Sequence, residues 1–233
     1  MSQSAIPNPQ PERPIPINLD AVVTEDNTPV DNFLSAKLQR LLVEVLYSSW
    51  ASFGMERPFI ADADIGIFAS VHQPPIVPDV FVSLDVEAPQ DFREKKNRAY
   101  FVWEFGKSPD VVIEIVSNRE GNELGSKLNA YARLGVPYYI VFDPLQQLGD
   151  EMLRVFGLWE GRYGALETPW LEQVGLGLRL WDGEFEGIRT TWLRWCDRHQ
   201  TLLPTGQERA IAAETKAAQL AAQLRALGID PEE

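Results

Sequence analysis

Residues 108–117 read SPDVVIEIVS, an apolar run of strand-forming residues interrupted by a single carboxylate, Glu114. Apolar residues at successive positions are typical of a strand in the middle of a sheet that is covered on both faces. The next segment, 122–134, has the pattern of a helix that ends at Gly135, and residues 138–142 read as a second buried strand. The order of strand, helix and strand predicts an α/β (α+β) core with a mixed sheet.

Further elements are expected on both sides of this core. Towards the N-terminus, Asp31 is an N-cap candidate for a helix whose apolar residues recur at three- and four-residue spacings until Gly54. Towards the C-terminus, turn signals at 159–162 and 181–184 predict appended β-hairpins, and residues 208–227 are predicted to form a separate helix. Strand candidates between the first helix and the core lie at 58–61, 65–70, 77–84 and 99–105.

The composition is that of an ordinary globular protein. Of the 233 residues, 45% are hydrophobic and 24% charged, which excludes collagen-like and disordered chains. The 21 Lys and Arg against 34 Asp and Glu give a net charge of −13. This charge repels polyanions at long range, so any contact with nucleic acid must rest on a local site.

Cysteine usage and hydropathy bear on the compartment. The single cysteine, Cys196, excludes an intrachain disulfide and a thiol cluster for zinc or iron–sulfur, and it favours a reducing compartment. The N-terminal residues lack the apolar run of a signal peptide, and no stretch approaches the roughly 18 consecutive apolar residues of a membrane span. We therefore expect a cytoplasmic protein.

Three regions are expected along the chain: a Pro-rich arm over 1–30, the α/β domain over 31–200 and a helical tail over 201–233. The tail carries apolar residues spaced 3, 4, 3, 4 and 3 apart, which suits a short coiled-coil seam. The members of this seam are Ala210, Ala213, Ala217, Leu220, Leu224 and Leu227. The seam predicts a homodimer, and the alternatives are a helix that packs on its own domain and a mobile helix.

Glu114 requires an explanation because a carboxylate inside an apolar strand is costly unless it is paired, protonated or bound to a cation. Asp79 is a second carboxylate, at the start of another apolar strand. With the main-chain carbonyl of Ile115, these two would offer Mg²⁺ or Mn²⁺ the hard oxygen ligands that they prefer. Lys127, on the following helix, could orient or deprotonate an attacking water.

Two alternatives to this metal site stay open. Lys127 could neutralise Glu114 in a structural ion pair without any metal, or Asp79, Glu114 and Lys127 could lie far apart.

The strings PDVVIEIVS, at 109–117, and GNELGSKLNAYARLGVPYYIVFDP, at 121–144, resemble the Uma2 family of restriction-endonuclease-like proteins, a branch of the PD-(D/E)XK nuclease-like superfamily. The resemblance extends roughly over residues 31–190. It implies a four-stranded mixed sheet flanked by helices and metal-dependent cleavage of phosphodiester bonds.

The resemblance also assigns residues. It implies that Asp79 is the first metal carboxylate, Glu114 the second and Lys127 the basic residue, within a frame formed by Tyr131, Gly135 and Asp143. In the wider superfamily the lysine comes two residues after the acid, but here that position is Val116. The resemblance implies that Lys127 takes over this role from the helix.

Other residues are candidates for supporting roles. Glu44 and Asp62 are possible auxiliary acids, although Glu44 could lie on a solvated helix face and Asp62, with Asp64, could bound a turn. Asp110 is expected to shape the entry to the strand that carries Glu114. The run 93–98, with net charge +3, is a possible phosphate contact or else a solvated loop. Its basic members are Arg93, Lys95, Lys96 and Arg98, with Arg119 and Arg133 as supplements.

The sequence thus predicts an Mg²⁺- or Mn²⁺-dependent endonuclease that acts on DNA. The alternatives are a non-catalytic binding or assembly protein that has kept the fold, and a phosphohydrolase for small nucleotides. His72 and His199 are too few for a multi-histidine metal centre, and Cys196 is expected to be a packing or exposed residue. No nucleotide-binding or serine-hydrolase motif is present, so no organic cofactor is expected.

Overall fold

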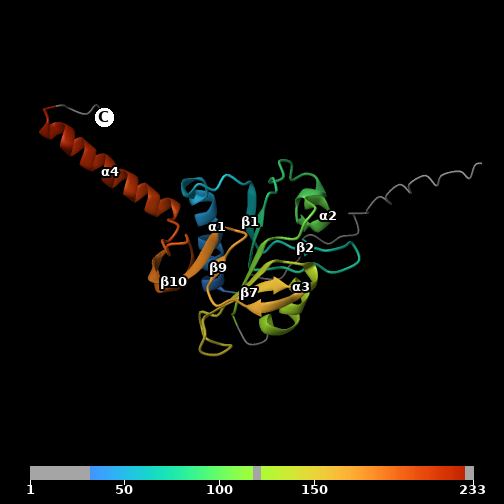
Figure 1. The fold of residues 1–233 in the computed structure, drawn as a ribbon. Coiled ribbons are helices and arrows are strands. Elements are labelled where there is room, and N and C mark those ends of the chain that lie inside the picture. Colours follow the sequence, from blue (N-terminus) through green and yellow to red (C-terminus); the bar gives the residue numbers. More distant parts are fainter. Residues whose placement is uncertain (1–31, 118–121, 229–233) are drawn as a thin grey trace, which may run out of the picture.

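A six-stranded mixed sheet forms the centre of the protein, in the computed structural model that describes residues 32–117 and 122–228 (Figure 1). Its strand order is β1-β3-β5-β6-β7-β8, with β5 and β6 parallel and the other neighbours antiparallel. The bounds are β1 Phe59–Ala63, β3 Val80–Leu84, β5 Val111–Ile115, β6 Tyr138–Phe142, β7 Leu153–Trp159 and β8 Arg162–Ala165. The predicted mixed α/β fold is confirmed, and the sheet has six strands rather than four because the β7–β8 hairpin extends its edge.

Strand β5 is buried along its whole length, as its apolar sequence predicts. Val111, Ile113 and Ile115 belong to the core on one face of the sheet, and Val112 and Val116 to the core on the other. Because side chains alternate along a strand, Glu114 points to the same face as these last two. The crossover from β5 to β6 contains the π-helical turn η4 (Glu123–Lys127) and helix α3 (Leu128–Leu134).

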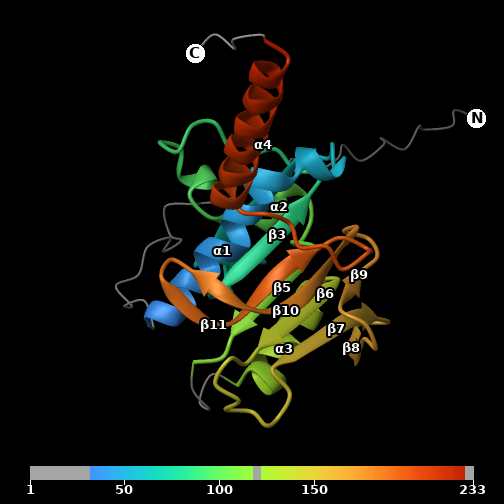
Figure 2. The same cartoon turned by 90° about the vertical axis from the view of Figure 1, so that its left-hand side faces the viewer.

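Helix α1 (Phe33–Ser49) lies between the six-stranded sheet and a smaller sheet of three strands (Figures 1 and 2). The smaller sheet consists of β9 (Trp170–Leu171), β10 (Leu176–Phe185) and β11 (Ile188–Cys196). The hairpin expected as an appendage therefore closes the core. The N-cap of α1 is Asn32, whose Oδ1 accepts a hydrogen bond from the Ser35 amide at 2.9 Å.

The turn predicted at residues 181–184 is wrong, because these residues continue β10 and pair with β11. The chain reverses instead at Glu186 and Gly187, whose φ angles of 45° and 75° suit a tight hairpin. Gly183 serves a different purpose: a Cβ there would lie 2.0 Å from the ring of Trp181. The glycine makes room for the tryptophan on the same strand. The turn at 159–162, by contrast, does connect β7 and β8.

The strand predicted at 99–105 is only partly correct. Strand β4 (Tyr100–Phe101) pairs in parallel with β2 (Ile67–Phe68), and the chain then forms the short helix α2 (Val102–Phe105). Gly106, with φ of 73°, ends this helix in a left-handed conformation that favours glycine. The strands expected at 58–61, 65–70 and 77–84 correspond to β1, β2 and β3 with shifted ends.

Helix α4 (Gly206–Ala226) confirms the predicted C-terminal helix and projects away from the body (Figure 1). Thr205 caps it, in a capping box with Glu208, but none of its residues is buried. Among the described residues, no helix is both long and apolar enough to cross a membrane. The predicted arm over 1–30, Asp31 and Arg119 lie outside the described residues.

Candidate functional site

Glu114 is the centre of the candidate site and is 1% exposed. Its Oε1 accepts a hydrogen bond from the Tyr131 hydroxyl at 2.7 Å, and its Oε2 accepts one from Lys127 Nζ at 2.8 Å. Both partners come from the η4–α3 crossover, which folds back over β5. The buried Glu114 carboxylate is therefore paired with the Lys127 ammonium and oriented by the Tyr131 hydroxyl.

Asp79 lies beside Glu114 at the end of the β3–β5 pairing. The last registered pair is Val80 with Ile113, and beyond it the Ile115 amide donates to Asp79 Oδ2 at 2.7 Å. Gln39 of α1 donates to the other carboxylate oxygen of Asp79, at 3.2 Å, and to Asp64 Oδ1 at 3.0 Å. Gln39 of α1 thus links the carboxylates of Asp79 and Asp64.

The structure therefore brings together the sequence candidates Asp79, Glu114, Ile115 and Lys127. The alternative in which they lie far apart is wrong. Lys127 reaches Glu114 from the last residue of the π turn, 13 positions along the chain, so an acid–lysine contact exists although Val116 occupies the usual lysine position.

The protonation of this pair follows from its burial. Burial raises the pKa of Glu114 to about 7, because the attraction to Lys127 only partly offsets the loss of solvent and the nearby Asp79 carboxylate adds to the shift. Burial lowers the pKa of Lys127, but the combined attraction of Glu114, Glu123 and Asp79 outweighs it and the net shift is upward. Lys127 is thus held as an ammonium, while Glu114 gains or loses its proton near neutral pH.

The two carboxylates that meet here, those of Asp79 and Glu114, are of the class that suits a hard divalent cation. No three His, Cys, Asp or Glu side chains converge as a metal-binding group within residues 32–117 and 122–228. Here the Lys127 ammonium, rather than a third carboxylate, lies against Glu114. The two carboxylates fit Mg²⁺ or Mn²⁺ by their chemistry, and the Ile115 carbonyl stays the predicted third ligand.

Glu123 also belongs to this site, although the sequence did not single it out. It is 4% exposed, and its Oε1 lies 3.6 Å from Lys127 Nζ. The signal that could have found it is its position four residues before Lys127, where side chains on a helical turn meet.

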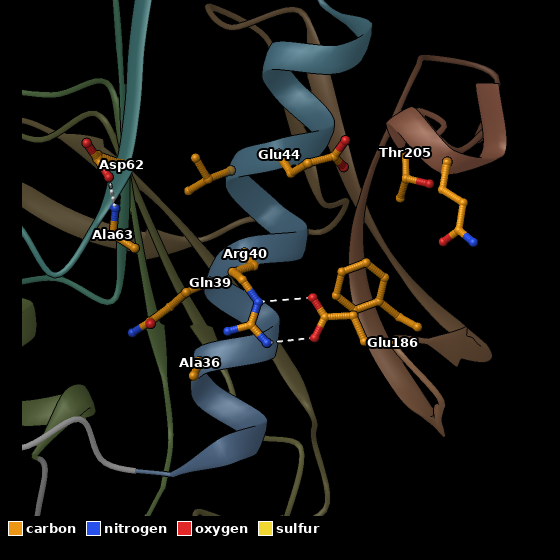
Figure 3. Close-up of a pocket in the computed structure, with 11 residues that line it drawn as sticks. Ala36, Gln39, Arg40, Glu44, Asp62, Ala63, Glu186 and Thr205 are labelled. Carbon is orange, nitrogen blue, oxygen red and sulfur yellow. Dashed lines mark hydrogen bonds and ion pairs between the residues drawn. The ribbon is translucent and has the colours of Figure 1, made fainter. Parts of the chain in front are cut away.

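Glu44 and Asp62 line a cavity of about 560 Å³ between α1, β1, the β10–β11 hairpin and the start of α4, and Gln39, the donor to Asp79, lines it too (Figure 3). Helix α1 packs on the face of the sheet opposite to Glu114. Glu44 Oε1 accepts hydrogen bonds from Ser48 and, at 2.8 Å, from the amide of Gly206, the first residue of α4. Because helix N-termini leave amides unpaired, Glu44 acts as a cap that docks α4.

The basic residues of 93–98 are not brought to the site. Their loop follows the C-terminal end of β3, whereas Asp79 precedes the N-terminal end of that strand. The loop lies beside α2, away from α3, in Figures 1 and 2. Within it, Lys96 pairs with Glu94 at 2.9 Å, and Arg98 donates to the carbonyls of Phe92 and Arg93.

Several other expectations concern structural residues. Asp110 accepts hydrogen bonds from the Leu84 amide at 2.7 Å and from Lys107 at 2.6 Å, so it does shape the entry to β5. Asp143 accepts two amides of the following turn, from residues 147 and 148. Cys196 is a buried packing residue. Arg133, His72 and His199 are exposed.

Comparison with known proteins supports the resemblance. None of the curated proteins matches the chain. A family model, Uma2, described as "Putative restriction endonuclease", matches residues 23–181, which is 159 of 233 residues and includes Asp79, Glu114, Glu123 and Lys127. With more than half of its length matched, the chain belongs to the Uma2 family.

Proposed function

We propose that this protein is an endonuclease that depends on a divalent cation, Mg²⁺ or Mn²⁺, and hydrolyses phosphodiester bonds of DNA. The observation that carries the proposal is the 2.8 Å contact between Lys127 Nζ and Glu114 Oε2 beside Asp79. It supplies the pairing of acid and lysine that nuclease chemistry needs, from a helix instead of from the strand. Membership of the Uma2 family supports the nuclease activity.

Each residue has a distinct role in this proposal. Asp79, Glu114 and the Ile115 carbonyl hold the cation, which when bound would lower the pKa of a water molecule and offset phosphate charge. Lys127 positions the attacking water. Tyr131 fixes the orientation of Glu114, and Gln39 that of Asp79, through the hydrogen bonds described above.

Two other functions are alternatives to the nuclease. A non-catalytic assembly protein is favoured by the net charge of −13 and by Val116. A phosphohydrolase for small nucleotides would not need a basic surface to attract its substrate. The family match and the buried acid–lysine contact favour the nuclease over both.

The single cysteine supports our proposal that the protein acts in a reducing, cytoplasmic environment.

Calorimetric titration with Mn²⁺ tests the metal site. Wild type is expected to bind Mn²⁺, with affinity that rises as the pH increases through about 7, because a proton on Glu114 competes with the cation. Glu114→Gln should abolish this binding, whereas Glu104→Gln, which removes an exposed carboxylate in α2, should leave it unchanged. Absence of binding by wild type at pH 8 would favour the assembly protein.

We also propose that two chains form a homodimer through α4. All the seam residues from Ala210 to Leu227 are exposed, and the leucines at 220, 224 and 227 are 50%, 36% and 76% exposed. Arg209 and Glu214 flank the seam five residues apart, the spacing at which opposite charges meet between the strands of a parallel coiled coil. The partner that suits this exposed face of α4 is a second copy of the same chain.

Charge reversal tests the dimer. Arg209→Glu or Glu214→Arg should each raise the dissociation constant roughly tenfold in sedimentation experiments, because both symmetric pairs become repulsive. The double variant should restore the wild-type constant. Lys216→Glu is the control, since its counterpart five residues on is Ala221. A monomeric wild type, or a double variant no better than the single ones, would contradict this arrangement.

A further inference from the structure

Glu123 has a buried carboxylate oxygen that the proposed chemistry does not use. Its side chain is 5% exposed, and Oε2 has no hydrogen-bond partner among the described residues. A buried polar atom without a partner is destabilising, and more so if it is charged. Native proteins contain few such atoms, and each calls for an explanation such as a catalytic role or a bound water or ion.

The Glu123 carboxylate lies close to a cation through its other oxygen, Oε1. Lys127 Nζ lies between two carboxylates, at 2.8 Å from Glu114 Oε2 and 3.6 Å from Glu123 Oε1. If Nζ moved 0.8 Å closer to Glu123 Oε1, this ion pair would become as short as the contact with Glu114. The lysine side chain has rotatable bonds enough to cover this distance without movement of the backbone.

The present partners of Glu114 create a conflict with metal binding. Both of its oxygens are engaged, one by Tyr131 and the other by the Lys127 ammonium. A divalent cation on Glu114 would meet a positive charge at 2.8 Å from the same carboxylate. Repulsion by the cation would drive the ammonium away from Oε2, and in a buried site the displaced ammonium needs a new acceptor.

We propose that Glu123 is this acceptor: a positioning residue that takes over the Lys127 ammonium when Glu114 turns to a divalent cation. The inference rests on the proposed function. The transfer keeps the ammonium within the site, where it can orient the nucleophile, and keeps it charged because it exchanges one carboxylate for another. Glu123 itself is not a ligand of the cation.

The local backbone suits this role. Glu123 and Lys127 are the first and last residues of η4, a single π-helical turn, and such turns are rare and frequent at functional sites. The Tyr139 hydroxyl donates to the Glu123 carbonyl at 2.9 Å, which anchors the start of the turn to β6. The acceptor is thus fixed while the lysine side chain moves.

A double-mutant cycle measured by Mn²⁺ calorimetry on the full chain tests the transfer. Glu123→Gln should weaken Mn²⁺ binding at pH 8 by about tenfold or more, the usual effect of an outer-shell partner. In a Lys127→Met background, the same substitution should change the affinity less than about twofold, because no ammonium needs an acceptor. A through-space effect of the lost negative charge would instead persist in that background and would overturn the inference.

Thermal unfolding without metal provides a second readout. Glu123→Gln should leave the Tm unchanged or raise it, because it neutralises a buried oxygen that lacks a partner. A purely structural pair with Lys127 predicts a lower Tm, and that result would overturn the inference. If wild type and Glu123→Gln bind Mn²⁺ equally, the transfer is wrong and the proposed metal site stands. If wild type binds none, both fail.

Discussion

Trp195→Ala is expected to lower the free energy of unfolding by about 3–5 kcal/mol, the range for loss of a large aromatic side chain from a core. Trp195 is 1% exposed on β11, and its Nε1 donates to the Leu42 carbonyl of α1 at 2.9 Å. The substitution leaves a cavity between α1 and the smaller sheet and removes the hydrogen bond that joins them.

Urea unfolding followed by far-ultraviolet circular dichroism measures this change. Trp159→Ala is the matched control, because Trp159 is 78% exposed at the end of β7 and its loss should change the free energy by less than about 0.5 kcal/mol. The loss of unfolding free energy for Trp195→Phe should lie between the losses for Trp159→Ala and Trp195→Ala. A loss below 1 kcal/mol for Trp195→Ala would mean that the smaller sheet does not close the core.

Lys127→Met is expected to destabilise the protein more at pH 8 than at pH 5. The folded-state pKa of Glu114, about 7, lies above its ordinary value of 4.5, so the stability tied to its protonated form is present at low pH and is lost as the pH rises through 7. Without the ammonium, the pKa of Glu114 rises further. At pH 8 the variant must either bury an unpaired carboxylate or keep Glu114 protonated, and both lower its stability.

The expected loss at pH 8 is about 2 kcal/mol, below the range for a fully buried pair because the Lys127 side chain is 33% exposed. At pH 5 Glu114 is protonated in both proteins, and the difference should be small. Denaturant unfolding at the two pH values gives the comparison, with the exposed Lys216→Met as the control. A loss that is the same at both pH values would contradict the pairing.

Much of the core was predictable because its signals are local. The apolar run of β5, interrupted by Glu114 alone, and the periodicity of α1 follow directly from burial. The turn at 181–184 was misplaced because Asp182-Gly183 has the chemistry of a turn, while the reason for the glycine is the Trp181 ring beside it. Such a contact depends on side-chain placement, which a turn signal does not contain.

The candidate site was predictable in part. Asp79, Glu114 and Lys127 could be named because the two acids lie in apolar strand segments and Lys127 lies on the helix that follows Glu114. The family resemblance assigns the same three residues. Glu123 was missed because a glutamate at the start of a helix is ordinarily a favourable surface residue. Only the π turn and the packing of Tyr139 bury it beside the lysine.

The role of Glu44 was also beyond reach of the sequence. Its position in the middle of a helix suggested either a solvated face or an auxiliary acid. The structure uses it to cap a helix that begins 162 residues later. No pattern along the chain connects the two segments, because the contact arises from the way the C-terminal helix docks on α1.

The most direct test of the central claim is a nicking and linearisation assay on supercoiled plasmid with Mg²⁺ or Mn²⁺, with nucleotides as a parallel substrate. Wild type should cut the plasmid and leave nucleotides intact. Glu114→Gln and Lys127→Ala should both lose cutting while remaining folded, and Glu104→Gln should cut like wild type. Cutting that persists in the Glu114 variant, or wild type that hydrolyses nucleotides and not DNA, would contradict the assignment of Asp79, Glu114 and Lys127 to a DNA-cleaving site.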